Sequence, residues 1–387
     1  MSADRAPIPL SEPALGGREW EYVRDCLDTG WISSVGKWVD RFERELAARV
    51  DAPHAVATAS GTAALHVALL VAGVREGDEV LVPALTFIAP ANAVRYAGAW
   101  PVFVDAEPAH WQLDVRRAAE FLSEGCERRG DALVNRASGR RVSAVIPVHV
   151  LGHPVDMEPL VEVARRHGLA VVEDASEALG SRYRGRPAGM LGDVGVFSFN
   201  GNKILSTGGG GMLVTARADW AARARYLTTQ AKDDPVEYVH REIGFNYRLT
   251  NLQAAVGCAQ LEQLDGFLSA RRRIAAAYDA ALASITGLTP QPEAAWASSN
   301  GWLYTVRAGA SCAIDSRRLI AALAQEQIQA RPLWQPLHRS PAHAGAEALG
   351  GAVADEIHRT AVSLPSSAGL TAAAQQRVVD ALARAAR

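Results

Sequence analysis

Features that define several common protein classes are absent from this chain of 387 residues. No apolar run approaches the roughly 20 residues that a membrane-spanning helix requires, and the best one, residues 63–73, is interrupted by His66. The first ten residues contain Asp4, Arg5 and two prolines in place of the apolar stretch of a secretory signal. We therefore expect a cytoplasmic protein.

Cysteines are few and the net charge is close to zero. The four cysteines, at positions 26, 126, 258 and 312, have no short spacing between any two, which excludes a zinc knuckle and argues against a disulfide framework. The 40 Lys and Arg residues nearly balance 42 Asp and Glu residues, and no basic block occurs. Nucleic-acid binding is therefore not expected. With 49% hydrophobic and 21% charged residues, the composition is that of a soluble globular protein.

Common motifs of catalysis and nucleotide binding are also missing. No GxSxG elbow, Walker A loop or GxGxxG run occurs, which excludes the usual hydrolase, NTPase and dinucleotide-binding classes. His149 and His153 are four residues apart, but Gly152 and Pro154 prevent the helix that would align them. We therefore expect no metal site there.

Short apolar runs alternate with helical patterns over the first 250 residues. Strands are predicted at residues 54–59, 79–82, 101–104, 142–148, 169–173, 194–199 and 211–214, and helices at residues 62–72, 88–97 and 157–167. Mostly apolar strands that alternate with helices indicate a largely parallel sheet covered on both faces. This pattern predicts an α/β fold of the doubly wound kind.

The pattern changes after residue 250. One long helix is predicted at residues 251–282, followed by a loop at 287–300, a strand at 302–306 and a helix at 316–326. The remainder, including residues 371–386, is typical of a smaller α+β domain, and residues 12–49 are helical in part. We predict a large domain of residues 1–250 and a small domain of residues 251–387, with an N-terminal segment able to pack against the small one.

A strand leads through Ser60, Gly61 and Thr62 directly into a helix. The free backbone N–H groups at a helix N-terminus bind anions, and a glycine there lets a phosphate group approach closely. The alternative is an ordinary helix cap made by Ser60 or Thr62, which is the commoner use of such residues.

Asp174 and Lys203 both follow apolar strands. Asp174 lies at a strand's carboxyl end, where open α/β sheets place ligand groups; its alternative role is a helix N-cap. A lone lysine is usually a solvated surface residue, but Lys203 has no charged neighbour within seven residues and is followed by the glycines at 208–211. This context favours a recessed amine of the kind that Schiff-base chemistry uses.

A phosphate cradle, a strand-end carboxylate and a recessed lysine together favour pyridoxal phosphate. In such enzymes the lysine makes an imine with the cofactor, and the carboxylate keeps the pyridinium protonated so that the ring acts as an electron sink.

The sequence resembles the DegT/DnrJ/EryC1/StrS family of nucleotide-sugar aminotransferases, which are fold type I pyridoxal-phosphate enzymes. The likeness runs from residues 9–13 to 364–366, and its strongest motifs are residues 173–175, 198–203 with the glycines that follow, and 244–249. It implies a large doubly wound domain, a smaller α+β domain, and a homodimer with shared active sites.

The resemblance also implies roles for single residues. Lys203 would bond the cofactor and later shuttle a proton, and Asp174 would pair with the pyridinium nitrogen. Glu177, where many relatives have Gln or His, would lie near the phenolic oxygen. The other implied cofactor contacts are Ser60, Gly61, Thr62, Phe87, Ser198, Asn200 and Asn246, the last reaching the cofactor phosphate of the neighbouring subunit. Without the family, Phe87 would be interpreted as a core residue and Asn246 as a turn residue.

Three further runs, residues 28–37, 228–235 and 331–338, resemble the subgroup that aminates UDP-2-acetamido-2,6-dideoxy-hexos-4-ulose. With L-glutamate as amino donor, the product would be the 4-amino sugar on the route to bacillosamine or legionaminic acid. GDP-perosamine synthases share the first and third runs, so they are the alternative; the second run favours the UDP sugar. Leu151 stands where relatives often have Tyr. This difference argues against assigning the relatives' sugar contact to position 151.

Candidate substrate-binding residues follow from these runs and from the need of a diphosphate for cations. They are Trp31, Ser33, Lys37, Lys232, Arg248, Arg331 and His338. Each Lys or Arg could equally be a solvated surface charge, and His338 a packed interface histidine. A non-catalytic nucleotide-sugar-binding protein of the same fold is a further alternative. A 3-dehydratase of this fold has His in place of the lysine, so Lys203 argues against that branch.

Overall fold

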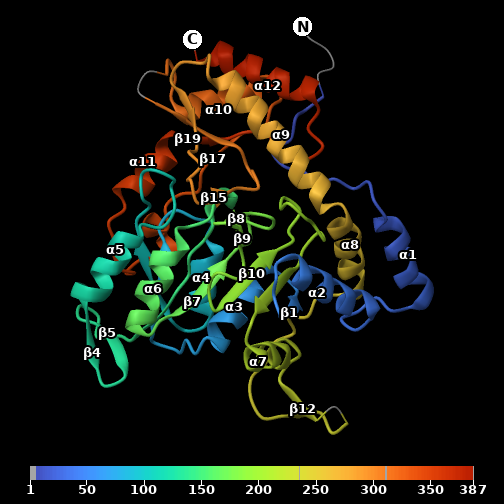
Figure 1. Ribbon diagram of the computed structural model, residues 1–387, viewed down its shortest axis with the longest axis vertical. Coiled ribbons are helices and arrows are strands. Elements are labelled where there is room, and N and C mark those ends of the chain that lie inside the picture. The colour runs from blue at the N-terminus through green and yellow to red at the C-terminus, as the bar shows by residue number, and fades with distance from the viewer. Residues whose placement is uncertain (1–5, 235, 310–311, 387) are drawn as a thin grey trace.

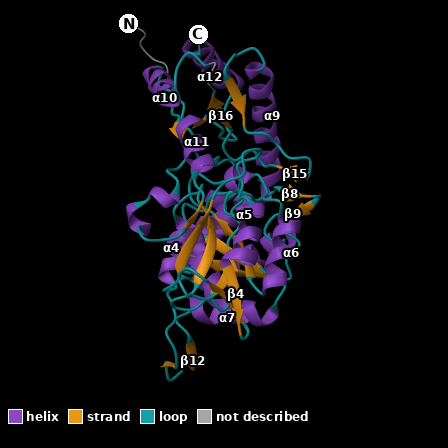
Figure 2. Ribbon diagram, turned by 90° about the vertical axis from the view of Figure 1, so that its left-hand side faces the viewer, coloured by secondary structure: helices purple, strands orange, loops and turns teal. Residues whose placement is uncertain are grey.

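A computed structural model describes residues 6–234, 236–309 and 312–386 of the chain. At its centre lies an eight-stranded sheet with helices on both faces (Figure 1, Figure 2). The strands, in sheet order, are β1 (His54–Thr58), β11 (Gly211–Thr215), β10 (Val194–Ser198), β7 (Ala170–Asp174), β6 (Val142–Val145), β2 (Glu79–Pro83), β3 (Trp100–Val104) and β18 (Ala348–Leu349). Only β11 runs antiparallel to its neighbours in this sheet. The predicted α/β fold with a mostly parallel sheet is confirmed.

Three helices of the large lobe begin and end close to their predicted positions, namely α3 (Gly61–Val71), α4 (Ala89–Tyr96) and α6 (Met157–His167). Two more, α5 (Val115–Glu120) and α7 (Ala218–Thr228), were not predicted. The last turn of α6 is closed by Gly168, whose φ of 75° is readily adopted only by glycine. The strand predicted at 142–148 is shorter, because Pro147 has no N–H to continue the ladder and Val148 makes only an isolated bridge.

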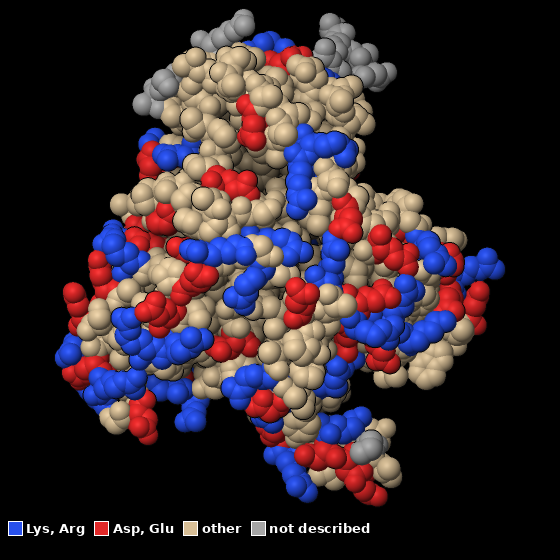
Figure 3. Space-filling model, viewed as in Figure 1, with Lys and Arg blue, Asp and Glu red and all other residues tan. Residues whose placement is uncertain are grey.

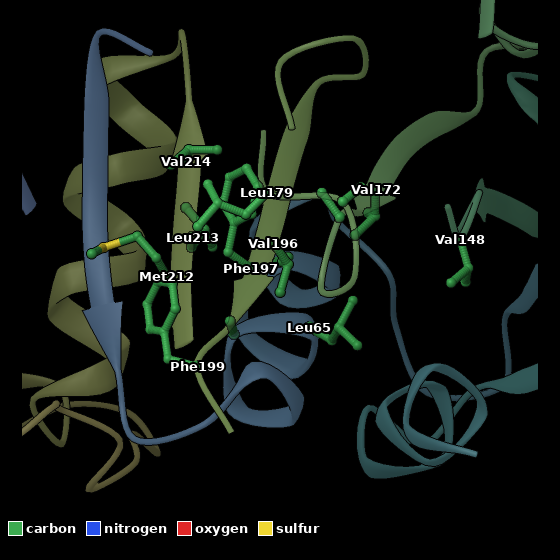
Figure 4. Close-up of a cluster of buried hydrophobic side chains, with 14 of the residues drawn as sticks. Leu65, Val148, Val172, Leu179, Val196, Phe197, Phe199, Met212, Leu213 and Val214 are labelled. Carbon is green, nitrogen blue, oxygen red and sulfur yellow. The ribbon is translucent and has the colours of Figure 1, made fainter. Parts of the chain in front are cut away.

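The core beneath the central strands is made of aliphatic and aromatic side chains. Figure 4 shows Leu65 of α3 below Val196 of β10, with Val172 and Leu213 on the strands to either side, all buried. Burying one such side chain stabilises the fold by about 1.5–3 kcal/mol. Because β11 and β2 are buried along their whole length, the loops at the ends of these strands start from fixed positions.

The prediction of one long helix at residues 251–282 is wrong in one respect. The structure has two helices, α8 (Asn251–Glu262) and α9 (Leu264–Leu282), separated at Gln263. The N–H of Gln263 donates to Gln260, one residue short of the α-helical spacing, and its side chain donates to Glu19 at 2.8 Å. Helix α8 packs on α1 (Glu19–Thr29) and α2 (Lys37–Arg49), the helices of the predicted partly helical N-terminal segment, whereas α9 leads into the upper lobe (Figure 1).

The upper lobe contains an antiparallel sheet and two long helices. Its strands, in order, are β14 (Leu288–Pro290), β16 (Thr305–Ala308), β19 (Ala361–Ser363) and β17 (Arg331–Pro332), with α10 (Ser316–Gln325) and α12 (Ala372–Ala385) beside them. The loop predicted at 287–300 therefore contains β14 and also β15 (Ala297–Ser298), and the strand predicted at 302–306 begins at Thr305. Turn and cavity contacts hold residues 302–304 outside the sheet.

Segments from both ends of the chain cross between the lobes. Ile8 forms a parallel bridge with Ile328 of the upper lobe, and β18, from the second half of the chain, pairs with β3 of the large sheet. The division of the chain near residue 250 stays a prediction.

Acidic and basic side chains are interspersed over the face shown in Figure 3, in keeping with a net charge of −2. Within the described ranges, no helix combines the length and the apolar character needed to cross a membrane.

Candidate active site

A cavity of about 350 Å³ opens at the carboxyl ends of β7 and β10. This is the edge at which open α/β sheets bind their ligands. Predicted cofactor residues line it, namely Ser60, Gly61, Thr62, Phe87, Asp174, Glu177, Ser198, Asn200 and Lys203. Segments that are far apart in the sequence thus meet at one place.

The first part of the cavity wall is the N-terminus of α3. Ser60 accepts a hydrogen bond from the N–H of Ala63 at 3.1 Å, so the predicted helix cap is confirmed. The first N–H groups of a helix have no partner within it, which leaves those of Gly61 and Thr62 for an anion. A Cβ on Gly61 would lie 2.8 Å from that of Ser198 and 3.4 Å from the Ser176 hydroxyl. Two hydroxyls and a helix N-terminus thus surround a space that a side chain at position 61 would fill, which fits a phosphate group.

Asp174 also lines the cavity. It is almost fully buried, and its Oδ1 accepts the N–H of Ser176 at 3.0 Å. The residues after it form turns, so the alternative role as a helix N-cap is wrong. Burial raises the pKa of the Asp174 carboxyl. A cationic ring nitrogen placed against it would favour the ionised form, so this residue fits the pyridinium of pyridoxal phosphate.

The neighbouring Glu173 has a different environment. Its carboxylate is 2.8 Å from Nε2 of His149 and accepts the N–H groups of Leu191 and Gly192. Burial alone would raise the pKa of Glu173, but these hydrogen bonds outweigh burial and lower it. These contacts favour the ionised form of Glu173 and fix the end of β7 that carries Asp174.

Lys203 is recessed, as the sequence predicted, with only 13% of its side chain exposed. Its Nζ lies 3.3 Å from Oε1 of Glu177 and 4.1 Å from the ring centroid of Trp302. The other carboxylate oxygen of Glu177 accepts the N–H of Leu151 at 2.9 Å. Burial raises the pKa of the Glu177 carboxyl, against the opposing effect of Lys203. The amine is therefore held between a carboxylate and an aromatic face.

Phe87 lies at the mouth of the cavity with 53% of its surface exposed. Its interpretation as a core residue is wrong. An exposed aromatic ring beside a cavity is free to stack on a planar ligand.

The predicted substrate contacts lie away from this cavity in the single chain. Trp31 and Lys37 line a separate cavity of about 500 Å³, where Lys37 pairs with Asp25 at 2.8 Å. The carbonyl of Ser33 accepts the N–H of Asn251.

The remaining predicted contacts also have their own partners. The side chain of Arg248 is 10% exposed and pairs with Glu43 at 2.9 Å. Lys232, in β12 (Lys232–Asp234), lies over the ring of Tyr238. Arg331 is on β17, and His338 lies 3.2 Å from Asp355. Asn246 forms an isolated bridge with Thr229, close in sequence to the hairpin of β12 and β13 (Val239–His240). The single chain does not bring these residues to the cavity, and their roles stay predictions.

Several cavity residues were not predicted as site residues. Ser176 directly follows the motif at 173–175, and Trp334 is inside the run at 331–338, so a closer search of those segments could have found them. Trp302 had no local signal, since it was assigned to a strand. In the described part of the chain, no three or more His, Cys, Asp and Glu side chains are grouped so as to hold a metal ion. His149 and His153 face different partners, Glu173 and the carbonyl of Pro154.

The fold and the cavity define a pyridoxal-phosphate enzyme of the aminotransferase class, and comparisons with known proteins agree. Residues 13–383 match the pattern of the DegT/DnrJ/EryC1/StrS aminotransferase family. The chain is 42% identical to GDP-perosamine synthase of Caulobacter vibrioides, over 98% of both chains. It is 37% identical to GDP-perosamine synthase of Escherichia coli O157:H7, over 94% of both.

A solved structure agrees with this. The structure of S. venezuelae DesV in complex with a ketimine intermediate has 35% identity and a TM-score of 0.85, and it covers 96% of this chain and 94% of that one. The chain belongs to the DegT/DnrJ/EryC1/StrS aminotransferase family. It is a sugar aminotransferase, and its cofactor is pyridoxal phosphate.

Proposed function

We propose that the enzyme transfers the amino group of L-glutamate to C4 of a GDP-linked 4-keto-6-deoxy sugar, the reaction type of a GDP-perosamine synthase. The observation that carries this proposal is the 42% identity to the Caulobacter vibrioides enzyme over 98% of both chains. The sequence motifs had favoured the UDP-acetamido sugar of the bacillosamine and legionaminic acid routes, with the GDP sugar as alternative. Similarity over the whole chain supports the GDP sugar better.

The UDP-acetamido sugar is the second candidate. It depends on the run at 228–235, which covers the end of α7 and the exposed strand β12. This run is short, so it carries less weight than a similarity that covers 98% of the chain.

When bound, pyridoxal phosphate supplies the electron sink for the amino transfer. Asp174 would hold the proton on the ring nitrogen, and the N-terminus of α3, together with Ser198 and Ser176, would hold the phosphate. Lys203 would hold the cofactor itself, and its amine, when free, would move a proton at the reacting carbon as general acid and base. Glu177 keeps the freed amine of Lys203 within reach of that carbon.

We further propose a homodimer in which Asn246 and some of the predicted substrate contacts serve the partner's cavity. The exposed apolar side chains beside these residues support it, since Trp31, Val236 and Ile243 are 57%, 79% and 84% exposed. Large exposed apolar groups mark interaction surfaces. Mixing an inactive Lys203→Ala variant with an Asn246→Ala variant should restore activity. No recovery in a demonstrated mixed dimer would contradict shared sites. A cytoplasmic location stays a prediction.

The substrate is tested by comparing kcat/KM for the two keto sugars under saturating glutamate. We expect the GDP-linked 4-keto-6-deoxy sugar to be preferred by at least about a hundredfold, since buried polar groups of a nucleotide site reject a different base strongly. Preference for the UDP-acetamido sugar would contradict the GDP sugar as substrate and support the second candidate.

Lys203→Ala should abolish turnover, because no other side chain lining the cavity can take its role. Full activity of that variant would contradict the site. A wild-type protein that binds the nucleotide sugar without any reaction with glutamate would indicate a non-catalytic binding protein.

A further inference from the structure

We propose that Trp302 is a positioning residue for the reaction: its indole face holds the amine of Lys203, opposite the Glu177 carboxylate, whenever that amine is not bonded to the cofactor. The inference rests on the role of Lys203 proposed above. It adds a residue that positions the amine during the stages at which the lysine is free.

The first observation is the geometry around the amine. Nζ of Lys203 lies 4.1 Å from the Trp302 ring centroid and 3.3 Å from Oε1 of Glu177. Cations within about 6 Å of an indole centroid are attracted to the ring face, more strongly where water is excluded. Both flanking residues are nearly fully buried. The ammonium group therefore has two attractive partners, a carboxylate and an aromatic ring face.

The second observation is that the indole ring is fixed. Its Nε1 donates to the carbonyl of Asn202 at 2.7 Å, the residue next to Lys203. The backbone N–H of Trp302 donates to Oδ1 of Asn300 at 2.9 Å. A ring held at both its edge and its backbone is a preorganised partner and does not have to be ordered during the reaction.

The third observation links the two sides of the lysine. Nδ2 of the fully buried Asn300 donates to the carbonyl of Glu177 at 2.7 Å, while its oxygen accepts from Trp302. One amide side chain thus ties together the backbones of the two residues that carry the carboxylate and the aromatic ring. The spacing that receives the amine is built into the fold.

A freed lysine needs such a holder. Its four-carbon stem has several rotatable bonds and considerable rotamer entropy, so an unheld amine would sample positions from which it cannot reach the reacting carbon. Lys203 is free in both half-reactions, with glutamate and with the sugar. Loss of the holder should therefore slow both halves, whereas loss of a sugar contact should slow only the second.

Trp334 offers a matched control. It lines the same cavity and stacks on Trp302, with ring centroids 6.3 Å apart and an interplanar angle of 13°. The aromatic face on Lys203 belongs to Trp302 and not to Trp334. A substitution of Trp334 therefore shows the effect of changing an aromatic residue of the same cavity that does not lie against the lysine amine.

The test is NMR of the holoenzyme, helped by a composition that contains only three lysines, Lys37, Lys203 and Lys232. Lysine labelled with carbon-13 at Cε gives three side-chain signals, which Lys37→Arg and Lys232→Arg variants assign. After conversion by glutamate, the Cε protons of Lys203 should be shifted upfield by the indole ring. We expect the shift to persist in Trp334→Phe and to vanish in Trp302→Leu. An unshifted Lys203 signal in the wild-type enzyme would overturn the role of Trp302.

Single-turnover kinetics complete the test. Trp302→Phe, with a weaker ring face, should slow both half-reactions by a similar factor of roughly three to ten. Slowing of the sugar half-reaction alone would overturn the proposal and make Trp302 a sugar contact. A Lys203 signal that is unchanged when the cofactor is added would instead overturn the proposed function of Lys203, which separates the two failures.

Discussion

Three buried carboxyl groups follow one another within five residues at the end of β7, and their surroundings differ. Hydrogen bonds outweigh burial and lower the pKa of Glu173, whereas burial raises the pKa values of Asp174 and Glu177. Environments that push such values apart assign different roles to the same chemical group. Glu173 is held in the core by its contact with His149. The carboxyl groups of Asp174 and Glu177 line the cavity, where a bound cation or a proton would balance their negative charge.

Position 61 tests the phosphate cradle directly. Gly61→Ala should weaken cofactor binding by about tenfold or more, because its Cβ would collide with Ser198 and overpacking of this kind costs about 1–3 kcal/mol. Gly201→Ala is the control, since a Cβ there meets no atom within 4 Å. Fluorescence or absorbance titration with pyridoxal phosphate measures both. Equal affinities for the two variants would contradict the cradle.

A second prediction at the residue scale concerns His153, which is buried and neutral. Burial lowers the pKa of His153 to about 4, against the opposing effect of the Pro154 carbonyl. The unfolded chain takes up this proton below about pH 6.5 and the folded chain does not, so stability must fall as the pH falls between these values.

The measurement is urea unfolding of the wild type and of His153→Gln at pH 7 and pH 5. The wild type should lose about 2 kcal/mol more than the variant over this interval. The same loss in both proteins would mean that His153 is not the group responsible.

At the scale of elements, a glycine in the middle of α8 and another in the first turn of α9 separate packing from helix propensity. A Cβ on Gly257 would lie 2.8 Å from the ring of the buried Phe42, whereas one on Gly266 would meet nothing within 4 Å. Gly257→Ala should therefore destabilise the protein by about 1–3 kcal/mol. Gly266→Ala should stabilise it by about 0.5–1 kcal/mol through helix propensity. Thermal unfolding that moves both variants in the same direction would contradict the described packing of α8.

Elements with strong local patterns were predictable, and their boundaries depended on contacts between distant residues. The α6 helix ends at its predicted glycine because Gly168 carries its own signal in the sequence. The break at Gln263 has no such signal, since it depends on a hydrogen bond to Glu19 from another helix. Similarly, β18 is two residues long and becomes a strand only by pairing with β3.

At the scale of the whole molecule, the site is assembled from two lobes. The large lobe contributes residues that follow its strands, and these could be predicted because each stands beside a recognisable strand end or glycine turn. Trp302 and Trp334 come from the second half of the chain and reach the cavity only through tertiary packing. For this reason the cofactor-binding residues could be predicted from the sequence more completely than the tryptophans that line the rest of the cavity.

Lys203 is the residue proposed to carry the cofactor and to release it to an amino donor. Borohydride reduction followed by peptide mass spectrometry tests this directly, since the chain has only three lysines. We predict the added mass of the cofactor on the peptide that contains Lys203, and its absence when the enzyme is first treated with L-glutamate. Cofactor mass on Lys37 or Lys232, or labelling of Lys203 that glutamate does not prevent, would contradict the claim.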